Sequence, residues 1–195
     1  QFGNGLMMAE ERGDITRCDK YDDKYVFLTE YYRAECSIAE KLAEMIKRSD
    51  GGEVDFSQEI AGVELEQGIR YEALQREAIN GCMNNHVFIL TGGPGTGKTT
   101  TLNAVISLCR KRGLKMKLAA PTGRAAKRMA DLTGAPAQTI HRLLEVDYSG
   151  GVVSFIHNDK NLLKCDVVIL DEMSMVDAKL FQALLAAARY HCRII

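Results

Sequence analysis

The sequence lacks several features that would place it in other protein classes. No apolar run approaches the roughly twenty residues that a membrane-spanning helix needs, and no secretory leader is visible. The six cysteines are scattered and none forms a C-x-x-C pair, which argues against a zinc site and against a disulfide framework. We therefore expect reduced, mostly buried thiols in a cytoplasmic protein that has no membrane partner.

Charge is present in both signs, but it is unevenly distributed along the chain. The net charge is −1, yet residues 1–70 carry 16 acidic and 9 basic side chains, whereas residues 71–195 carry 10 acidic and 16 basic ones. This basic excess is larger than a nucleotide site alone requires, which makes nucleic acid a candidate partner. Solvated ends of helices and strands would explain the same charges.

The chain changes character near residue 70, where we place a soft boundary between residues 1–70 and 71–195. The first part predicts a small α+β accessory segment, with a hairpin over 14–28 and helical patterns over 30–48 and from Phe56 to Gly68. The second part repeats strand-then-helix units, namely 87–90 with 98–112, 115–120 with 123–132, and 166–170 with 178–189. This alternation predicts an α/β fold, a parallel sheet with helices on both faces. Residues 193–195 resemble the opening of another strand, so we expect a truncated domain.

A phosphate-binding motif lies between the first of these strands and its helix. Its sequence, over residues 91–100, is TGGPGTGKTT. Glycines let backbone amides turn toward phosphate and a helix N-terminus adds a positive end, so the pattern indicates a P-loop rather than an ordinary Gly-rich turn. Lys98 supplies a point charge and Thr99 a magnesium ligand. The residues expected to bind nucleotide in this motif are Gly93, Gly95, Thr96, Gly97, Lys98, Thr99 and Thr100.

Two adjacent carboxylates follow the apolar run at 167–170. Asp171 is expected to hold magnesium through water, and Glu172 to orient or deprotonate the water that attacks the γ-phosphate. A strand that ends in acidic residues is common by itself, but after a P-loop it predicts the second half of an ATPase site. The candidate catalytic residues are therefore Lys98, Asp171 and Glu172.

Two short segments are candidates for contact with nucleic acid. Thr122 and Arg124 follow the second strand of residues 71–195, at the sheet edge where parallel α/β folds bind ligands, and they suit a phosphodiester backbone. Thr139, His141 and Arg142 repeat that combination of a hydroxyl with possible phosphate donors. Alternatively, Thr122 and Thr139 serve only as helix N-caps.

Five ordered segments together resemble the Q, I, Ia, Ib and II motifs of RecD-like helicases of superfamily 1B, which include the exodeoxyribonuclease V alpha subunit. They are QREAI at 75–79, GGPGTGKTT at 92–100, APTGRAA at 120–126, TIHR at 139–142 and DEMSMVD at 171–177. The resemblance extends over residues 12–195. It implies a first RecA-like motor domain that binds ATP and Mg2+, in which Gln75 reads the adenine.

The resemblance also implies that the intact protein couples ATP hydrolysis to movement along single-stranded DNA and to unwinding of duplex DNA. A second RecA-like domain would supply an arginine finger, and other subunits of a helicase–nuclease complex are further candidate partners. The 195 residues alone are then expected to bind ATP–Mg2+ and, weakly, single strands, without unwinding.

Three alternatives to this interpretation stay open. The chain could come from a relaxase-linked helicase of conjugation, whose motor motifs are similar. It could be a P-loop ATPase that does not act on DNA. It could also be a DNA-binding or assembly module that works without nucleotide.

Overall fold

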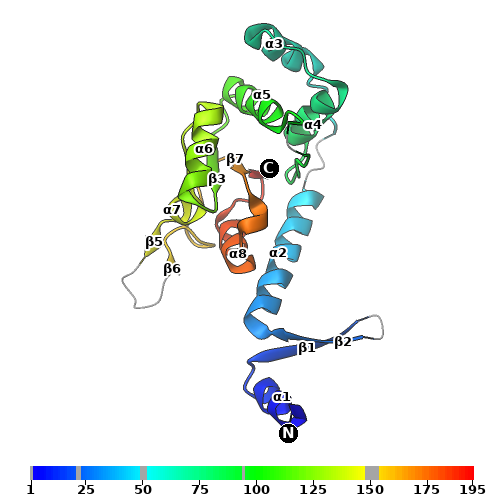
Figure 1. Cartoon of the computed structure of the whole chain (residues 1–195), viewed down its shortest axis with the longest axis vertical. Helices are drawn as coiled ribbons and strands as arrows, with labels where there is room; N and C mark the ends of the chain where they lie inside the picture. The colour runs from blue at the N-terminus through cyan, green and yellow to red at the C-terminus, as the bar shows by residue number, and fades with distance from the viewer. Residues whose placement is uncertain (1, 21–22, 49–51, 94, 148–153) are drawn as a thin grey trace.

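The computed structural model describes residues 2–20, 23–48, 52–93, 95–147 and 154–195, and its centre is a parallel sheet (Figure 1). The sheet has four strands in the order β4-β3-β7-β8, and every neighbouring pair is parallel. The strands are β3 (Met116–Ala120), β4 (Ala137–Thr139), β7 (Val167–Leu170) and β8 (Arg193–Ile194). The parallel α/β fold predicted from the strand–helix alternation is confirmed.

Helices cover both faces of this sheet. They include α4 (Ala73–Asn84), α5 (Lys98–Lys111), α6 (Gly123–Thr133), α7 (Ile140–Leu144) and α8 (Ala178–Ala187). Leu118 and Ile169 pack in one apolar cluster with residues of α4, α5 and α6, whereas Ala119 and Val168 pack in another with residues of α7 and α8. Since successive strand residues point to opposite faces, the apolar end of β3 (residues 118–120) and the apolar run of β7 require this double cover.

The strand expected over 87–90 forms only at its first residue. Val87 makes an isolated parallel bridge to Ile194, with the Phe88 amide 2.9 Å from the Ile194 carbonyl oxygen. Ile89 has no ladder partner among the described residues and is 83% exposed. The stretch nevertheless lies beside β8, which sits between it and β7.

The N-terminal part is a hairpin joined to a long helix. Strands β1 (Ile15–Lys20) and β2 (Asp23–Leu28) pair antiparallel as predicted, while the expected turn includes residues 21–22, which lie outside the described residues. Helix α2 (Thr29–Lys47) leads from this hairpin to the sheet, where it packs against α8 and buries Met45 (Figure 1). Helix α1 (Phe2–Glu11) was not predicted, because glycines at 3 and 5 weaken the helical pattern.

Helix α3 (Ser57–Gln67) ends at Gly68, as the pattern predicted, with that glycine in the left-handed region at φ 65°. It packs against α4 and α5, and Phe56, Ile60 and Val63 share their cluster with the core of the sheet domain. The boundary at residue 70 stays a prediction, but the P-loop core draws on residues that precede it. None of the helices in the described part of the chain is long and apolar enough to cross a membrane.

The core beneath α8 gives the first prediction. Leu184 is 0% exposed, whereas Leu65 on α3 is 85% exposed. We expect Leu184→Ala to lower the free energy of unfolding by about 2–5 kcal/mol, because it removes buried contacts and leaves a cavity. The matched helical control Leu65→Ala is expected to change it by no more than about 0.5 kcal/mol. Urea denaturation followed by circular dichroism measures both, and equal losses would contradict the assigned packing.

Candidate functional site

The parallel sheet brings the predicted site residues to one edge. The P-loop follows residues 87–90, Asp171 follows β7, Thr122 follows β3, and Thr139 ends β4. Because all these strands run in the same direction, their carboxyl ends meet at the same edge. The stretch at 87–90 and β7 are two strand positions apart, about 10 Å. The edge therefore carries the phosphate-binding motif and the carboxylates on one side of β7 and the nucleic-acid candidates on the other.

The P-loop has the backbone expected of a phosphate-binding turn. Gly95 and Gly97 lie in the left-handed region, at φ 75° and 82°, and Gly97 is the N-cap of α5. The Lys98 ammonium donates to the carbonyl oxygens of Gly92 and Gly93, the latter at 2.9 Å, so its side chain turns into the loop. Thr96 Oγ1 also donates to the Gly93 oxygen, at 2.9 Å. Lys98 thus reaches the interior of the loop, where a phosphate group would lie.

The remaining P-loop residues differ in exposure. Thr99 is exposed at the first turn of α5, and Thr100 is half-buried beside it. Thr101 is buried and its hydroxyl donates to the Gly97 carbonyl oxygen at 3.1 Å, which fixes the loop-to-helix junction. Pro94 of the motif lies outside the described residues. Thr99 is therefore exposed at the start of α5, and its role as a magnesium ligand stays a prediction.

Gln75 reaches the P-loop from a different helix. Its Oε1 accepts a hydrogen bond from the Glu72 amide at 3.0 Å, and the two residues form a capping box at the start of α4. The other end of the amide lies over the loop, because a Cβ added to Gly97 would be 2.2 Å from Gln75 Nε2. The E-x-x-Q spacing is a capping signal that sequence reasoning missed. The structure thus places Gln75 and the P-loop in direct contact.

Asp171 and Glu172 leave β7 through a sharp turn. The Asp171 amide donates to the Ala119 carbonyl oxygen at 3.1 Å, which continues the ladder with β3, and Asp171 Oδ1 accepts from the Glu172 amide at 2.9 Å. Glu172 has φ 55°, in the left-handed region that a glutamate seldom adopts. Such outliers cluster at functional sites. Asp171 is exposed and Glu172 half-buried, so the two carboxylates have different environments.

The donor set suits a nucleotide-bound magnesium ion rather than a metal held by protein alone. Among the described residues, no group of three or more His, Cys, Asp or Glu side chains is placed to bind a metal. Magnesium with a nucleotide needs only one or two protein oxygens, because phosphates and water supply the others. An exposed Thr99 hydroxyl and an exposed Asp171 carboxylate at the same sheet edge fit that requirement.

Thr122 and Thr139 are helix caps in this structure. Thr122 Oγ1 accepts from the Ala125 amide and Thr139 Oγ1 from the Arg142 amide, both at 3.2 Å. The cap uses an acceptor site of each hydroxyl and leaves its hydrogen available to another partner. A cap and a contact to DNA are thus compatible, and the second role stays a prediction.

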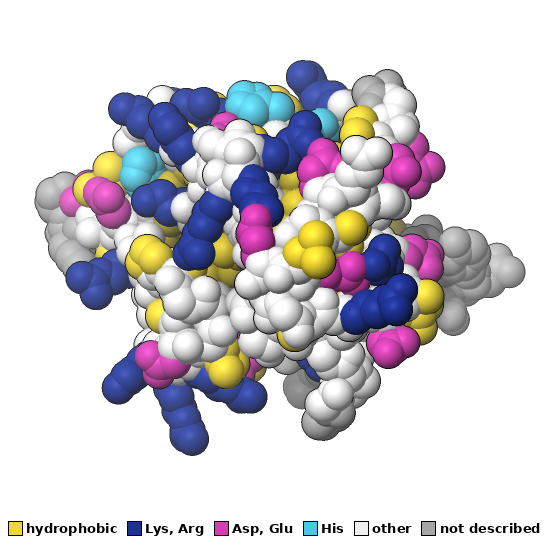
Figure 2. Space-filling model, turned by 90° about the horizontal axis from the view of Figure 1, so that it is seen from above, with side chains coloured by type: hydrophobic (Ala, Val, Ile, Leu, Met, Phe, Trp, Pro, Cys, Tyr) yellow, Lys and Arg dark blue, Asp and Glu magenta, His cyan; other side chains and the backbone are white. Residues whose placement is uncertain are grey.

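Basic side chains near these caps are exposed. Arg124, His141 and Arg142 all face solvent, and the His141 ring lies 6.1 Å from that of Phe155, at 54°. In the described part of the chain no ion pair engages Arg124 or Arg142. A space-filling view shows Lys, Arg and His side chains gathered along one rim of the molecule (Figure 2). Phe155, in the short hairpin of β5 (Val146–Asp147) and β6 (Ser154–Phe155), was not predicted as a neighbour of His141.

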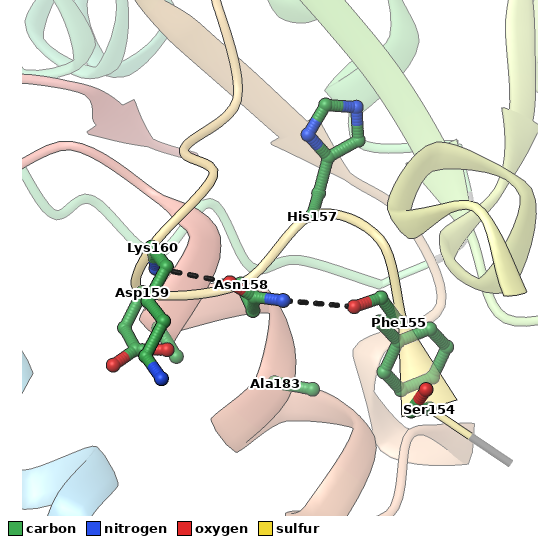
Figure 3. A pocket seen from close by; sticks show the side chains of 8 residues that line it. Ser154, Phe155, His157, Asn158, Asp159, Lys160 and Ala183 are labelled. Atoms are coloured by element: carbon green, nitrogen blue, oxygen red, sulfur yellow. Dashed lines mark hydrogen bonds between the residues drawn. The ribbon is translucent and has the colours of Figure 1, made fainter. Parts of the chain in front are cut away.

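Two hollows among the described residues lie away from the P-loop. One, of ≈ 270 Å³, lies between residues 154–160 and α8 (Figure 3), and the other, of ≈ 300 Å³, between α2 and α8. In the first, the Asn158 side chain donates to the Phe155 carbonyl oxygen at 3.0 Å and accepts from the Lys160 amide at 2.9 Å. Its amide group therefore stabilises its own loop. Neither hollow brings together a set of residues with evident chemistry.

The ionisable groups beneath the site are structural. Burial raises the pKa of the Cys82 thiol to about 12 and that of Cys109 to about 11, so both stay neutral. Burial also lowers the pKa of His86, and the nearby Arg193 cation lowers it further. Cys165 and Cys192 are buried as well, whereas Cys18 and Cys36 are half-buried, and all six thiols are free. Four of the six cysteines are thus buried, as expected, and their reduced state stays a prediction.

Comparison with known proteins agrees with this geometry. A family model described as an AAA domain matches residues 75–195. The chain is 31% identical over 195 residues to the RecBCD enzyme subunit RecD of Mycolicibacterium smegmatis, an overlap of 87% of this chain and 33% of that protein. It is 40% identical over 121 residues to the ATP-dependent RecD2 DNA helicase of Deinococcus radiodurans, which covers 62% of this chain and 16% of the relative.

This chain is a RecD-like member of the AAA-domain family. A further relative of the RecD-like chain is the ATP-dependent DNA helicase dda of Enterobacteria phage T4, 40% identical over 114 residues, or 56% of this chain and 26% of that protein. The chain spans a third or less of the length of each of these three relatives. The predicted resemblance to RecD-like helicases is confirmed.

The contact between Gln75 and Gly97 gives the second prediction. Gly97→Ala places a side chain at φ 82° and displaces the Gln75 amide from its bond with Glu72. The control Gly113→Ala has φ 69° and nothing within 4 Å of its Cβ, so it carries only the backbone cost of about 1–2 kcal/mol. We expect the greater loss of unfolding free energy for Gly97→Ala.

A second background isolates the side-chain contact. In a chain that already carries Gln75→Ala, the two glycine variants are expected to lose the same free energy of unfolding, because the clash is gone. A difference that persists in that background would contradict the contact.

Proposed function

We propose that this chain is the ATP-binding half of the motor of a RecD-like DNA helicase. The observation that carries the proposal is the contact of Gln75 with Gly97 of the P-loop, at the sheet edge where β7 delivers Asp171. A P-loop alone indicates phosphate binding. A hydrogen-bonding amide held directly above it adds a group that fits the edge of a nucleobase, and adenine offers both a donor and an acceptor to such an amide.

The residues divide the chemistry between them. Lys98 neutralises phosphate charge, and the amides of the loop and of the first turn of α5 bind phosphate oxygens. Thr99 and Asp171 would hold the magnesium ion, which supplies positive charge to the phosphates when bound. Glu172, in its strained turn, orients a water molecule for attack on the γ-phosphate or accepts its proton.

A single strand of DNA would lie across the other half of the same edge. Thr122, Arg124, Thr139, His141 and Arg142 are the residues that we assign to it, through phosphate contacts. The residues assigned to DNA lie close to those assigned to ATP, because β3 pairs with β7 on one side and with β4 on the other. Asp171 and Glu172 therefore follow the strand next to the one that Thr122 follows.

The activity that we propose for the whole protein requires more than the residues described. The relatives' names include ATP-dependent DNA helicases and a subunit of the RecBCD enzyme. By analogy we propose that the intact protein is an ATP-hydrolysing helicase that acts in the cytoplasm. A second RecA-like domain would provide the arginine finger, and further subunits are candidate partners. Without that finger the chain is expected to hydrolyse ATP more slowly by about 10³-fold or more.

Replacement of Lys98 tests the nucleotide site. Lys98→Ala is expected to weaken binding of ATP–Mg2+ at least about tenfold, because a charged hydrogen bond to phosphate is lost. The exposed Lys127→Ala on α6 serves as the control with the same loss of charge and should bind as the unmodified chain does. Isothermal titration calorimetry measures the dissociation constants. Equal affinities for the three chains would refute the ATP site and favour a module that works without nucleotide.

Salt dependence tests the assignment to DNA and separates it from an ATPase that does not bind DNA. Loss of two phosphate contacts in the double variant Arg124→Ala and Arg142→Ala should reduce the slope of log K against log salt by about 1.4 for single strands. Lys115→Ala with Lys164→Ala removes two charges that precede β3 and β7, at the opposite edge, and should leave the slope unchanged. Fluorescence anisotropy with a labelled oligothymidine gives both slopes. Salt-independent or absent binding by the unmodified chain would favour the ATPase alternative.

A further inference from the structure

A buried carboxylate lies next to the helix that carries Gln75. Glu64, on α3, is 9% exposed and precedes the residues that the AAA-domain model matches. Its Oε1 accepts a hydrogen bond from the Tyr71 amide at 2.7 Å, and its Oε2 pairs with the Arg76 guanidinium. A buried charge is costly unless it is paired in this way. The position of these partners therefore depends strongly on the Glu64 charge.

The partners of Glu64 flank the capping box of α4 on both sides. Tyr71 immediately precedes the N-cap residue Glu72, and Arg76 immediately follows Gln75. The Tyr71 hydroxyl is also bonded to Gln67 Oε1, at 2.7 Å. Glu64 thus holds the chain before and after the Glu72–Gln75 capping pair, and it limits the directions in which the first turn of α4 can move.

Helix α3 is in turn attached to the helix that begins at the P-loop. Lys111 and Arg112, at the end of α5, pair with Glu66 and Glu59 at 2.6 and 3.5 Å. Gln67 Nε2 donates to Ser107 Oγ at 3.2 Å. Each exposed pair contributes little by itself, but together with the shared apolar cluster they fix α3 on α5. Helix α3 therefore connects the element that carries Gln75 with the element that carries Lys98.

We propose that Glu64 is a positioning residue for recognition of the nucleobase. By holding the first turn of α4 against α3, and through α3 against α5, it sets the place of the Gln75 amide over Gly97. The inference rests on the proposed function, in which that amide contacts adenine. Glu64 does not touch the nucleotide. Its role is to keep the distance between the adenine-binding amide and the phosphate-binding loop constant.

The variant Glu64→Gln separates this role from simple stability. It keeps the size of the side chain and an acceptor for the Tyr71 amide, but it removes the charge opposite Arg76. Three ligands are compared by calorimetry on the 195-residue chain: ATP, purine riboside 5′-triphosphate, which lacks the 6-amino group, and inorganic tripolyphosphate. The unmodified chain is expected to prefer ATP to purine riboside triphosphate about fivefold, the effect of one hydrogen bond.

In Glu64→Gln that preference should fall to about one, by loss of ATP affinity, while affinity for tripolyphosphate stays as it was. A purely structural role would weaken all three ligands together. Glu66→Gln, which removes an exposed ion pair from the same helix, is the matched control and should keep the preference. If Glu64→Gln does not fold, Arg76→Gln, at the more exposed member of the pair, tests the same charge.

Gln75→Ala distinguishes failure of this inference from failure of the proposed function. If Gln75→Ala loses the preference for ATP and Glu64→Gln keeps it, the positioning role is overturned and the ATP site stands. If Gln75→Ala keeps the preference, or the unmodified chain shows none, the adenine contact is overturned and the positioning role with it.

Discussion

Parallel pairing of β3 with β7 is the constraint on which the rest of this structure depends. It buries residues 118–120 of β3 and most of β7 on both faces, so these residues are apolar and helices cover each side. The other strands of this sheet are parallel to β3 and β7, so the polar residues that follow these strands emerge at one edge. The site is thus a consequence of strand direction. Lys98 and Asp171 are 73 positions apart in the sequence, yet both follow segments whose carboxyl ends lie at this edge.

Features of the fold and site were predictable where they depend on residues close together in the sequence. The P-loop, the Asp171–Glu172 pair and the strand–helix alternation are local patterns, and the structure confirms the elements that they predicted. The strand at 87–90 was only partly right, since among the described residues its pairing is limited to the bridge of Val87 with Ile194 and the bond from the Phe88 amide to the Ile194 carbonyl oxygen. The contact of Gln75 with Gly97 joins two helices. No pattern within either helix specifies it.

The distribution of charge could likewise be read from the sequence, whereas the ion pairs that neutralise part of it depend on the fold. The acidic and basic halves of the sequence suggested a basic surface for nucleic acid. In the structure several of those basic residues bind acidic residues of the N-terminal part, as in Lys179 with Glu30 and Lys111 with Glu66. The imbalance is thus partly neutralised within the molecule. Arg124 and Arg142 form no ion pair among the described residues, so their charges stay available at the sheet edge.

The position of β8 between the P-loop stretch and β7 has a geometric consequence. The P-loop stretch and β7 are separated by two strand spacings, and backbone hydrogen bonds fix that spacing almost independently of side-chain identity. Substitutions in the surrounding core can therefore weaken the fold without changing the separation of the phosphate loop from the carboxylates. This separation is set by the backbone, which side-chain substitutions leave in place.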